Sequence, residues 1–235
     1  MSERNKLTAT ELQTEFKRRQ PWFTLFWIEG QSFGGAFDAG HDPRVDQFFE
    51  HFPDARSILE LGSLEGGHTL NIARRPGVHR VLSIEGRRAN YDRAQFIKQV
   101  YGADNVTFQL ANLEKARLTD WGQFEAVFCV GLLYHLPEPW KLIEQIARVS
   151  SRLFIWTHYA AEQKANKVVN GYRGLHYQEF GLKDVLSGLS AKSFWPTREA
   201  LLAMLARHNF AATEIVEDDP GHMHGPAITL AARRA

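Results

Sequence analysis

Five short apolar segments alternate with segments of helical periodicity from about residue 56 onward, and this alternation limits what the chain can fold into more than any other feature of its sequence. The apolar segments are Ser57–Leu61, Arg80–Ile84, Val106–Leu110, Ala126–Val130 and Arg152–Thr157. Each is brief and apolar along nearly its whole length, which is typical of parallel strands buried on both faces. The helical segments between them are Gly67–Arg74, Arg88–Tyr101 and Pro139–Val149. This order predicts an α/β domain with a doubly wound, mostly parallel sheet between two layers of helices, a three-layer α/β/α arrangement.

The C-terminal part of the chain extends the predicted sheet to seven strands. Thr197–His208 has the pattern of a helix, with Thr197 as its N-cap. Two strand segments follow, Ala211–Glu217 and Ala227–Ala232, and the connector between them is rich in turn-forming residues. We therefore expect an antiparallel C-terminal hairpin at one edge of the sheet.

Two segments fall outside this alternation. Residues 1–55 begin with a helix over about Thr8–Arg19 and continue into an aromatic stretch and a glycine-rich loop, which we interpret as an N-terminal helical and aromatic lid. Residues 56–235 are predicted to form the main domain. Within it, residues 160–195 are an insertion rich in Tyr, His and Gly, and insertions at the carboxyl ends of strands are where α/β folds place substrate contacts.

The composition argues against several classes of function. Lys and Arg number 28 against 27 Asp and Glu, a net charge of +1, so a nucleic-acid partner is not expected. A single cysteine, Cys129, excludes internal disulfides and cysteine-based zinc clusters, and no metal site is expected. The longest apolar stretch, residues 126–134, is far shorter than the ~20 residues of a membrane-spanning helix. The first residues have no signal-peptide pattern, so we expect a cytoplasmic protein that does not bind membranes.

The stretch after the first predicted strand carries the clearest indication of a ligand. Glu60 lies near the end of that strand, and Gly62, Ser63 and Gly66 follow in a turn that opens a helix. Glycine lets a backbone turn sharply or lie directly against a ligand. The next strand ends at Glu85, whose carboxylate is placed to bind the two hydroxyl groups of a ribose. These residues predict a cofactor that contains adenosine.

Two adenosine cofactors compete for this loop. NAD would place its pyrophosphate on a G-x-G-x-x-G turn. Here Leu64 occupies a glycine position, and we expect the Glu65 carboxylate to lie inside the loop, where it would repel a pyrophosphate. S-adenosylmethionine (SAM) carries a sulfonium and an ammonium group and no phosphate, so acidic surroundings suit it. The loop therefore favours SAM over an NAD-dependent oxidoreductase.

Together with two later motifs, these residues resemble the class I SAM-dependent methyltransferases over about residues 56–159. Asn112 and Leu113 follow the third strand, where that family usually has an aspartate near the adenine amine, and an asparagine oxygen can still accept the hydrogen bond. The most specific match follows the fourth strand and reads Gly131-Leu132-Leu133-Tyr134-His135-Leu136-Pro137. The resemblance implies that SAM is bound by Glu60, Gly62, Ser63, Gly66, Glu85, Gly86, Asn112, Leu113, Gly131 and Tyr134.

The resemblance also implies an in-line transfer of a methyl group, in which alignment of two bound reactants supplies much of the catalysis. A hydroxyl acceptor would need a base, and histidine is the usual one. His135 follows the fourth strand and is the leading candidate, and His158 ends the fifth strand at the same sheet edge. His222 and His224 fall in the hairpin connector, which we interpret as a polar turn because no third metal ligand is near.

We expect the acceptor to be a small molecule that is methylated at oxygen or nitrogen. Candidate contacts are side chains that can stack on a ring or form hydrogen bonds, in the insertion and its flank: Tyr159, Tyr172, Arg173, His176 and Trp195. Two alternatives stay open. One is an enzyme that adds a methyl or carboxymethyl group to the wobble uridine of tRNA, and the other is a SAM-binding protein without catalysis. The oligomeric state stays open between a monomer and a homodimer.

Overall fold

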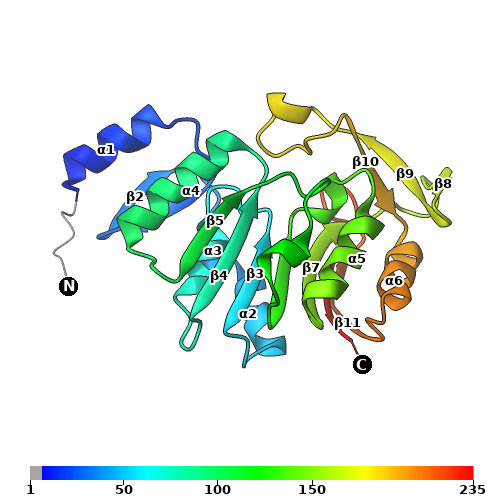
Figure 1. Ribbon diagram of the computed structural model, residues 1–235. Helices are drawn as coiled ribbons and strands as arrows, with labels where there is room; N and C mark the ends of the chain where they lie inside the picture. Colours follow the sequence, from blue (N-terminus) through cyan, green and yellow to red (C-terminus); the bar gives the residue numbers. More distant parts are fainter. Residues whose placement is uncertain (1–6, 235) are drawn as a thin grey trace.

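The computed structural model describes residues 7–234, and its main element is a seven-stranded sheet. The strands follow the order β11-β12-β7-β6-β3-β4-β5, which confirms the predicted doubly wound architecture (Figure 1). Their bounds are β3 Ser57–Leu61, β4 Arg80–Glu85, β5 Val106–Leu110, β6 Ala126–Val130, β7 Arg152–His158, β11 Ala212–Asp219 and β12 Ala227–Arg233. Strand β12 is antiparallel to both of its neighbours, β7 and β11, whereas the other adjacent pairs are parallel. The C-terminal hairpin therefore lies at the sheet edge, as predicted.

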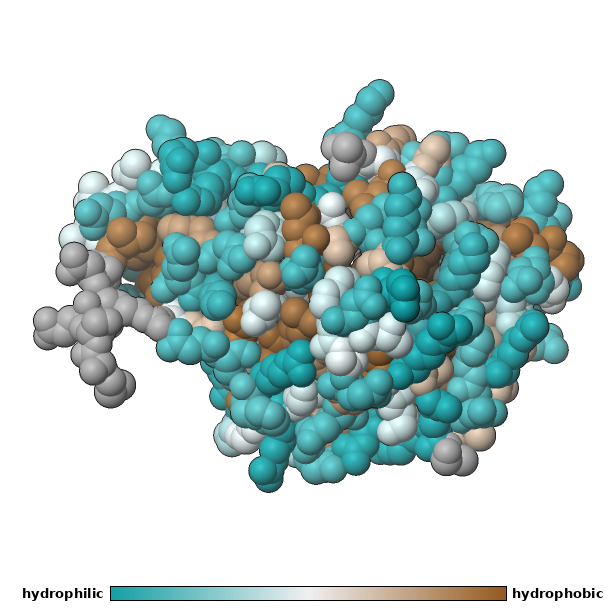
Figure 2. All heavy atoms as spheres, viewed as in Figure 1, coloured by the Kyte–Doolittle hydropathy of each residue, from teal (hydrophilic) through white to brown (hydrophobic). Residues whose placement is uncertain are grey.

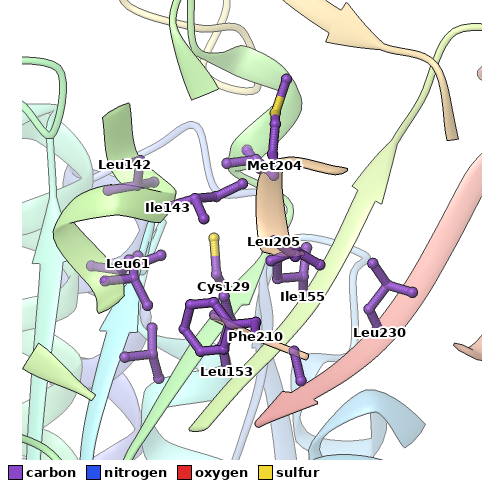
Figure 3. Close-up of a cluster of buried hydrophobic side chains, with 14 of the residues drawn as sticks. Leu61, Cys129, Leu142, Ile143, Leu153, Ile155, Met204, Leu205, Phe210 and Leu230 are labelled. Carbon is purple, nitrogen blue, oxygen red and sulfur yellow. The ribbon is translucent and has the colours of Figure 1, made fainter. Parts of the chain in front are cut away.

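Helices cover both faces of this sheet, which gives the three predicted layers. One face carries α2 (Pro43–His51), α3 (Gly67–Ala73) and α4 (Arg88–Tyr101), and the other carries α5 (Pro139–Val149) and α6 (Arg198–Arg207). Successive side chains of a strand point to opposite faces. Ile58 of β3 accordingly joins a buried cluster with Phe48 of α2, whereas Leu61 joins a cluster with Ile143 of α5 and Leu205 of α6. Cys129 of β6 lies inside the second cluster (Figure 3).

The N-terminal elements pack beside α4, at the side of the sheet that ends with β5 (Figure 1). Helix α1 (Ala9–Arg18) begins at a capping box between Thr8 and Glu11. A two-stranded hairpin follows, β1 (Leu25–Ile28) with β2 (Gln31–Gly34). The ring of Phe16 in α1 lies 5.0 Å from the ring of Phe33 in β2 and 5.5 Å from that of Phe96 in α4. An aromatic cluster thus attaches the N-terminal elements to the main domain.

The insertion after β7 forms a small antiparallel sheet that the sequence analysis did not predict. Its strands are β8 (Lys167–Val169), β9 (Tyr172–Gln178) and β10 (Lys192–Pro196), with β9 in the middle. A 3-10 turn, η4 (Gly181–Lys183), lies between β9 and β10. In Figure 1 this yellow segment lies over one end of the main sheet.

The remaining short 3-10 segments, η1 (Ala39–His41), η2 (Leu118–Trp121) and η3 (Leu133–His135), lie in loops. Glu85 ends β4 and His158 ends β7, each one residue beyond its apolar segment and at the strand end that the sequence predicted. Among the described residues, no helix is both long and apolar enough to cross a membrane. Hydrophilic side chains cover most of the face in Figure 2, and apolar ones form small separate patches there.

Candidate active site

The carboxyl ends of the parallel strands open into a cavity of about 930 Å³. Its walls come from the loops after β3, β4, β5 and β6, from the end of β7, and from three further regions. These regions are residues 23–47 before the sheet, residues 177–195 of the insertion, and the loop between β11 and β12. A cavity at this edge is the usual ligand site of an open α/β sheet.

Glu85 forms one polar wall of the cavity. Its side chain is only 6% exposed, and its two carboxylate oxygens accept hydrogen bonds from the backbone N–H groups of Leu64 (2.9 Å) and Arg87 (2.7 Å). Burial raises the pKa of Glu85 to about 7, although the two backbone donors act in the opposite direction. The carboxylate can accept further hydrogen bonds from ribose hydroxyl groups, which fits the predicted cofactor.

The glycine-rich turn faces the cavity with its backbone and with Ser63. Gly62 and Gly66 adopt positive φ angles of 85° and 86°, a region that favours glycine. The Ser63 hydroxyl is buried and has no hydrogen-bond partner among the described residues, so it is available to a ligand. Gly66 is the N-cap of α3 and does not line the cavity.

Glu65 points away from the cavity, which corrects the expectation that its carboxylate lies inside the loop. The carboxylate accepts hydrogen bonds from the backbone N–H groups of Phe23 (3.0 Å) and Thr24 (2.7 Å). Arg93 lies 3.8 Å from it. Glu65 therefore ties the N-terminal segment to the cofactor loop, and its charge gives no argument about a pyrophosphate.

Glu60 lies beneath the loop and does not line the cavity either. It is 1% exposed and accepts hydrogen bonds from Ser83 of β4 (2.6 Å) and from Thr69 of α3. Burial raises the pKa of this carboxyl group. Glu60 thus joins β3, β4 and α3 under the cofactor loop, and the structure gives it no direct path to a ligand.

The other residues that were predicted to bind the cofactor border the cavity: Gly62, Ser63, Gly86, Asn112, Leu113, Gly131 and Tyr134. Asn112 differs in one respect from its expected role. Its side-chain oxygen already accepts a hydrogen bond from the backbone N–H of Glu114 at 2.9 Å, which closes an Asx turn. A carbonyl oxygen has a second lone pair, so a contact with an adenine amine still fits.

His135 lines the cavity next to the β6 loop and is held by a buried carboxylate. Its Nδ1 atom lies 3.2 Å from both oxygens of Glu179. Glu179 also accepts hydrogen bonds from Ser193 Oγ (2.6 Å), Ser187 Oγ and Gly188 N (2.7 Å). Burial alone would raise the pKa of Glu179, but these hydrogen bonds lower it to about 2. An ionised carboxylate only accepts hydrogen bonds, so Nδ1 of His135 carries a proton.

His158 lies at the end of β7 among aromatic rings. Its ring is stacked at 5.0 Å on Trp195, and the rings of Tyr134 and Trp156 lie 4.7 and 5.0 Å away. Nδ1 lies 2.9 Å from the carbonyl oxygen of Gly225 and 3.2 Å from that of Pro226. Burial lowers the pKa of His158, although the two carbonyl groups oppose this shift. The ring is therefore neutral at pH 7.

Of the five residues that were predicted to contact the acceptor, only Trp195 lines the cavity. Tyr159 donates a hydrogen bond to Asp218 at 2.9 Å, the ring of Tyr172 stacks on Trp140 at 6.0 Å, Arg173 pairs with Glu162 at 3.2 Å, and His176 lies against Phe194. Tyr172 thus attaches the small sheet to α5, His176 and Arg173 pack within the insertion, and Tyr159 ties the end of β7 to β11. His222 and His224 do line the cavity, and the described residues contain no group of ligands suited to a metal.

Sequence reasoning missed a polar group at the start of α2. Asp42 is the N-cap of this helix and is 5% exposed. It accepts hydrogen bonds from Arg44 Nε (2.8 Å) and lies 2.8 Å from His68 Nε2. Burial would raise the pKa of Asp42, but His68 and Arg44 hold it well below its usual range. The Asp-Pro pair does predict a helix start, yet no pattern shows that this helix borders the cavity.

Comparisons with known proteins agree with the site. A family model for a methyltransferase domain matches residues 59–152. The N-terminal domain of EvdMO1, solved in the presence of S-adenosylhomocysteine (SAH) and D-fucose, matches over 100% of both chains with 34% identity and a TM-score of 0.89. Against whole EvdMO1, with 32% identity and a TM-score of 0.78, the chain spans 49% of that protein's length.

More distant structures share the fold alone. Magnesium protoporphyrin IX methyltransferase from Synechocystis PCC 6803, solved with bound SAM, is 16% identical with a TM-score of 0.56. That match covers 83% of this chain and 80% of the other. Among curated proteins, no significant match is found.

Proposed function

Because the chain belongs to the class I SAM-dependent methyltransferases, with SAM as its cofactor, we propose that it methylates a hydroxyl oxygen of a small polyhydroxylated acceptor with His158 as the general base. The observation that carries this proposal is the hydrogen bonding of His158. Backbone carbonyl groups only accept hydrogen bonds, so Nδ1, which faces Gly225 O and Pro226 O, must carry the ring proton. Nε2 then has a free lone pair, and burial keeps the ring neutral and ready to take a proton.

The residues of the cavity suit the chemistry of this transfer. SAM, when bound, supplies a methyl group on a positively charged sulfur. Glu85 is placed to accept hydrogen bonds from ribose hydroxyl groups, and Ser63 has a free hydroxyl beside it in the loop. With SAM held there, an acceptor hydroxyl aligned with the methyl group would take the methyl and leave SAH, and His158 would take the hydroxyl proton on Nε2. No covalent intermediate with the protein is needed, so alignment of the two reactants supplies most of the rate.

Aromatic faces around His158 support a ring-shaped acceptor. Tyr134, Trp156 and Trp195 surround the imidazole at ring distances of 4.7 to 5.0 Å. Both faces of Trp195 are covered, by His158 and by Tyr177 at 4.6 Å, and Arg44 covers one face of Trp156, so a sugar ring would pack on the remaining apolar surface of this wall while its hydroxyl groups reach polar neighbours. The similar EvdMO1 domain was solved with D-fucose, a deoxysugar, which supports the same class of acceptor here.

His135 is the competing base. Glu179 holds its Nδ1 atom, which leaves Nε2 on the other side of the ring without a hydrogen-bond partner among the described residues. However, this histidine and Glu179 connect to the segment between β9 and β10, which suits an orienting role near the cofactor. We therefore assign proton removal to His158 and the alignment of the β6 loop to His135.

The experiment compares methyl transfer from labelled SAM to D-fucose and related monosaccharides by wild type, His158→Gln and His135→Gln. His208→Gln is the matched control, since His208 lies outside the cavity. We expect His158→Gln to lower kcat by about a hundredfold or more, with SAH affinity unchanged. In wild type, the rate should fall as the pH drops below the usual histidine range, because the pKa of His158 is lowered. Full activity of His158→Gln at saturating acceptor would refute the assignment.

A further inference from the structure

Helix α2 presents two polar side chains to the cavity that the cofactor chemistry does not use. Arg44 and Gln47 both line the cavity wall. They lie three positions apart, so they are neighbours on one face of the helix. Arg44 lies over the ring of Trp156, which in turn contacts His158 in the same cavity.

Arg44 is fixed from two sides. Its Nε lies 2.8 and 3.1 Å from the two oxygens of Asp42, to which Nη2 also donates, and the centre of its guanidinium lies 4.7 Å from the ring centre of Trp156. Asp42 is held in turn by His68. Among the described residues, Nη1 of Arg44 has no hydrogen-bond partner. Its two N–H donors are thus pre-oriented and unused.

Gln47 supplies the complementary acceptor. Its Oε1 atom is buried and has no hydrogen-bond partner among the described residues. Buried polar atoms of proteins are nearly always paired, and an unpaired one points to a missing partner. A free donor and a free acceptor on the same helix face match two neighbouring hydroxyl groups, one of which accepts while the other donates.

The charges around the cavity disfavour an anion. Six carboxylates line it: Asp38, Asp42, Glu85, Glu114, Asp184 and Glu217. Of the two arginines in the lining, Arg44 has its charge balanced by Asp42, and Arg87 donates to the backbone carbonyl groups of Gly181 and Ser187. Carboxylates thus outnumber arginines in the lining by six to two, and a phosphate group would enter a negative potential.

We propose that Arg44 and Gln47 form an acceptor subsite that binds two neighbouring hydroxyl groups of an uncharged polyol ring, and that sugars carrying a phosphate or a nucleotide are excluded. This subsite rests on the proposed function for its acceptor but concerns residues outside the transfer step. One consequence is an order of reactions. A sugar that travels on a nucleotide carrier has to be released from it, by hydrolysis or glycosyl transfer, before this protein methylates it.

The test measures binding of monosaccharides to the SAH-saturated protein by calorimetry and saturation-transfer NMR. The neutral probes are D-galactose, L-rhamnose and D-xylose. Galactose 1-phosphate serves as the charged counterpart of D-galactose. Arg44→Met keeps an apolar side chain against Trp156 but removes the guanidinium group. Gln47→Leu keeps the side-chain volume but removes the hydrogen-bond acceptor. Arg75→Met is the matched control because it removes an ion pair between Arg75, which follows the end of α3, and Asp46 of α2 outside the cavity.

We expect at least one neutral probe to bind wild type and Arg75→Met alike, and to bind each subsite variant about tenfold more weakly. SAH affinity should stay within about twofold, which shows that the variants are folded. Galactose 1-phosphate should bind more weakly than galactose. Tighter binding of the phosphate, unchanged binding by both variants, or no binding of any neutral probe overturns the subsite.

The subsite and the proposed reaction fail separately. If a neutral sugar binds in a way that depends on Arg44 but receives no methyl group, the subsite stands and the proposed transfer fails. If a sugar is methylated with the same KM by wild type and Arg44→Met, the transfer stands and the subsite is overturned.

Discussion

Replacing the buried carboxylate of Glu85 with an amide should stabilise the protein at alkaline pH and weaken cofactor binding. Glu85 is 6% exposed at the end of β4, and burial raises its pKa from 4.5 to about 7. The folded state therefore binds this proton more tightly than the unfolded state does. The resulting contribution to stability is fully present below pH 4.5 and is lost as the pH rises through 7. Glu85→Gln has no such titration.

The size of the effect follows from the shift in pKa. Each unit corresponds to about 1.4 kcal/mol, and most of the 4.5-to-7 interval lies between pH 5 and 8. Over that range, the unfolding free energy of wild type should fall by about 2.5 kcal/mol relative to Glu85→Gln. The amide oxygen of Glu85→Gln can keep only one of the two backbone hydrogen bonds. A pH-independent difference in unfolding free energy between the two proteins is therefore expected as well.

Urea denaturation at pH 5, 6, 7 and 8 without cofactor measures this difference, with Glu199→Gln on the exposed surface of α6 as the control. Calorimetry with SAH gives the second readout. Only the ionised carboxylate accepts from both ribose hydroxyl groups, so wild-type affinity should fall by up to about tenfold per unit below pH 7, while the variant stays weak and nearly pH-independent. A stability difference that is constant from pH 5 to 8 would refute the reasoning.

Three further predictions concern other buried groups. Glu65→Ala leaves the N–H groups of Phe23 and Thr24 without their acceptor, so the unfolding free energy should fall by about 3 kcal/mol in denaturation. Hydrogen exchange at these two amides should become faster, and unchanged exchange would contradict the role of Glu65 in holding the N-terminal segment. The pKa of Glu179 is lowered from 4.5 to about 2, so its contribution of about 3 kcal/mol is present above pH 4.5 and is lost as the pH falls through 2. About 2 kcal/mol of it is lost between pH 6 and pH 3, so the unfolding free energies of wild type and Glu179→Gln should approach each other by that amount in denaturation at these two pH values. Burial raises the pKa of Cys129 to about 12, so a thiol reagent should label it only in denaturant, and rapid labelling of the native protein would contradict its burial.

The main sheet was predictable because its strands are buried on both faces. A strand such as Ala126–Val130 must be apolar at every position, and such a run is visible without any tertiary information. The Glu85 position was predictable for a related reason, since a carboxylate that ends a buried strand stands out. Thr197 likewise caps α6 as expected, accepting from Ala200 N at 3.2 Å.

The surroundings of the acceptor were not predictable in the same way. Strands β8 to β10 carry Gly, His and charged residues, and their apolar and polar residues do not alternate. These strands are stabilised by pairing with each other and by Phe194 packing on Trp140, and neither contact leaves a pattern in the sequence. Tyr172 resembles a substrate contact in the sequence, yet it fills this interface. Arg44 shows the reverse case. It resembles an ordinary helix-surface residue, and only the folded chain brings it to Trp156, more than a hundred positions away.

The position of β12 affects the order in which the protein folds while it is being synthesised. This strand follows both β7 and β11 in the sequence, yet it lies between them and pairs with both. A domain that emerges from the ribosome N-terminus first can therefore assemble β3 to β7 early, but the edge of β7 stays exposed until translation has reached the end of β12. The loop that carries His222 and His224 is fixed only at that moment. The nascent chain can then form the cofactor loop before it has a complete acceptor pocket.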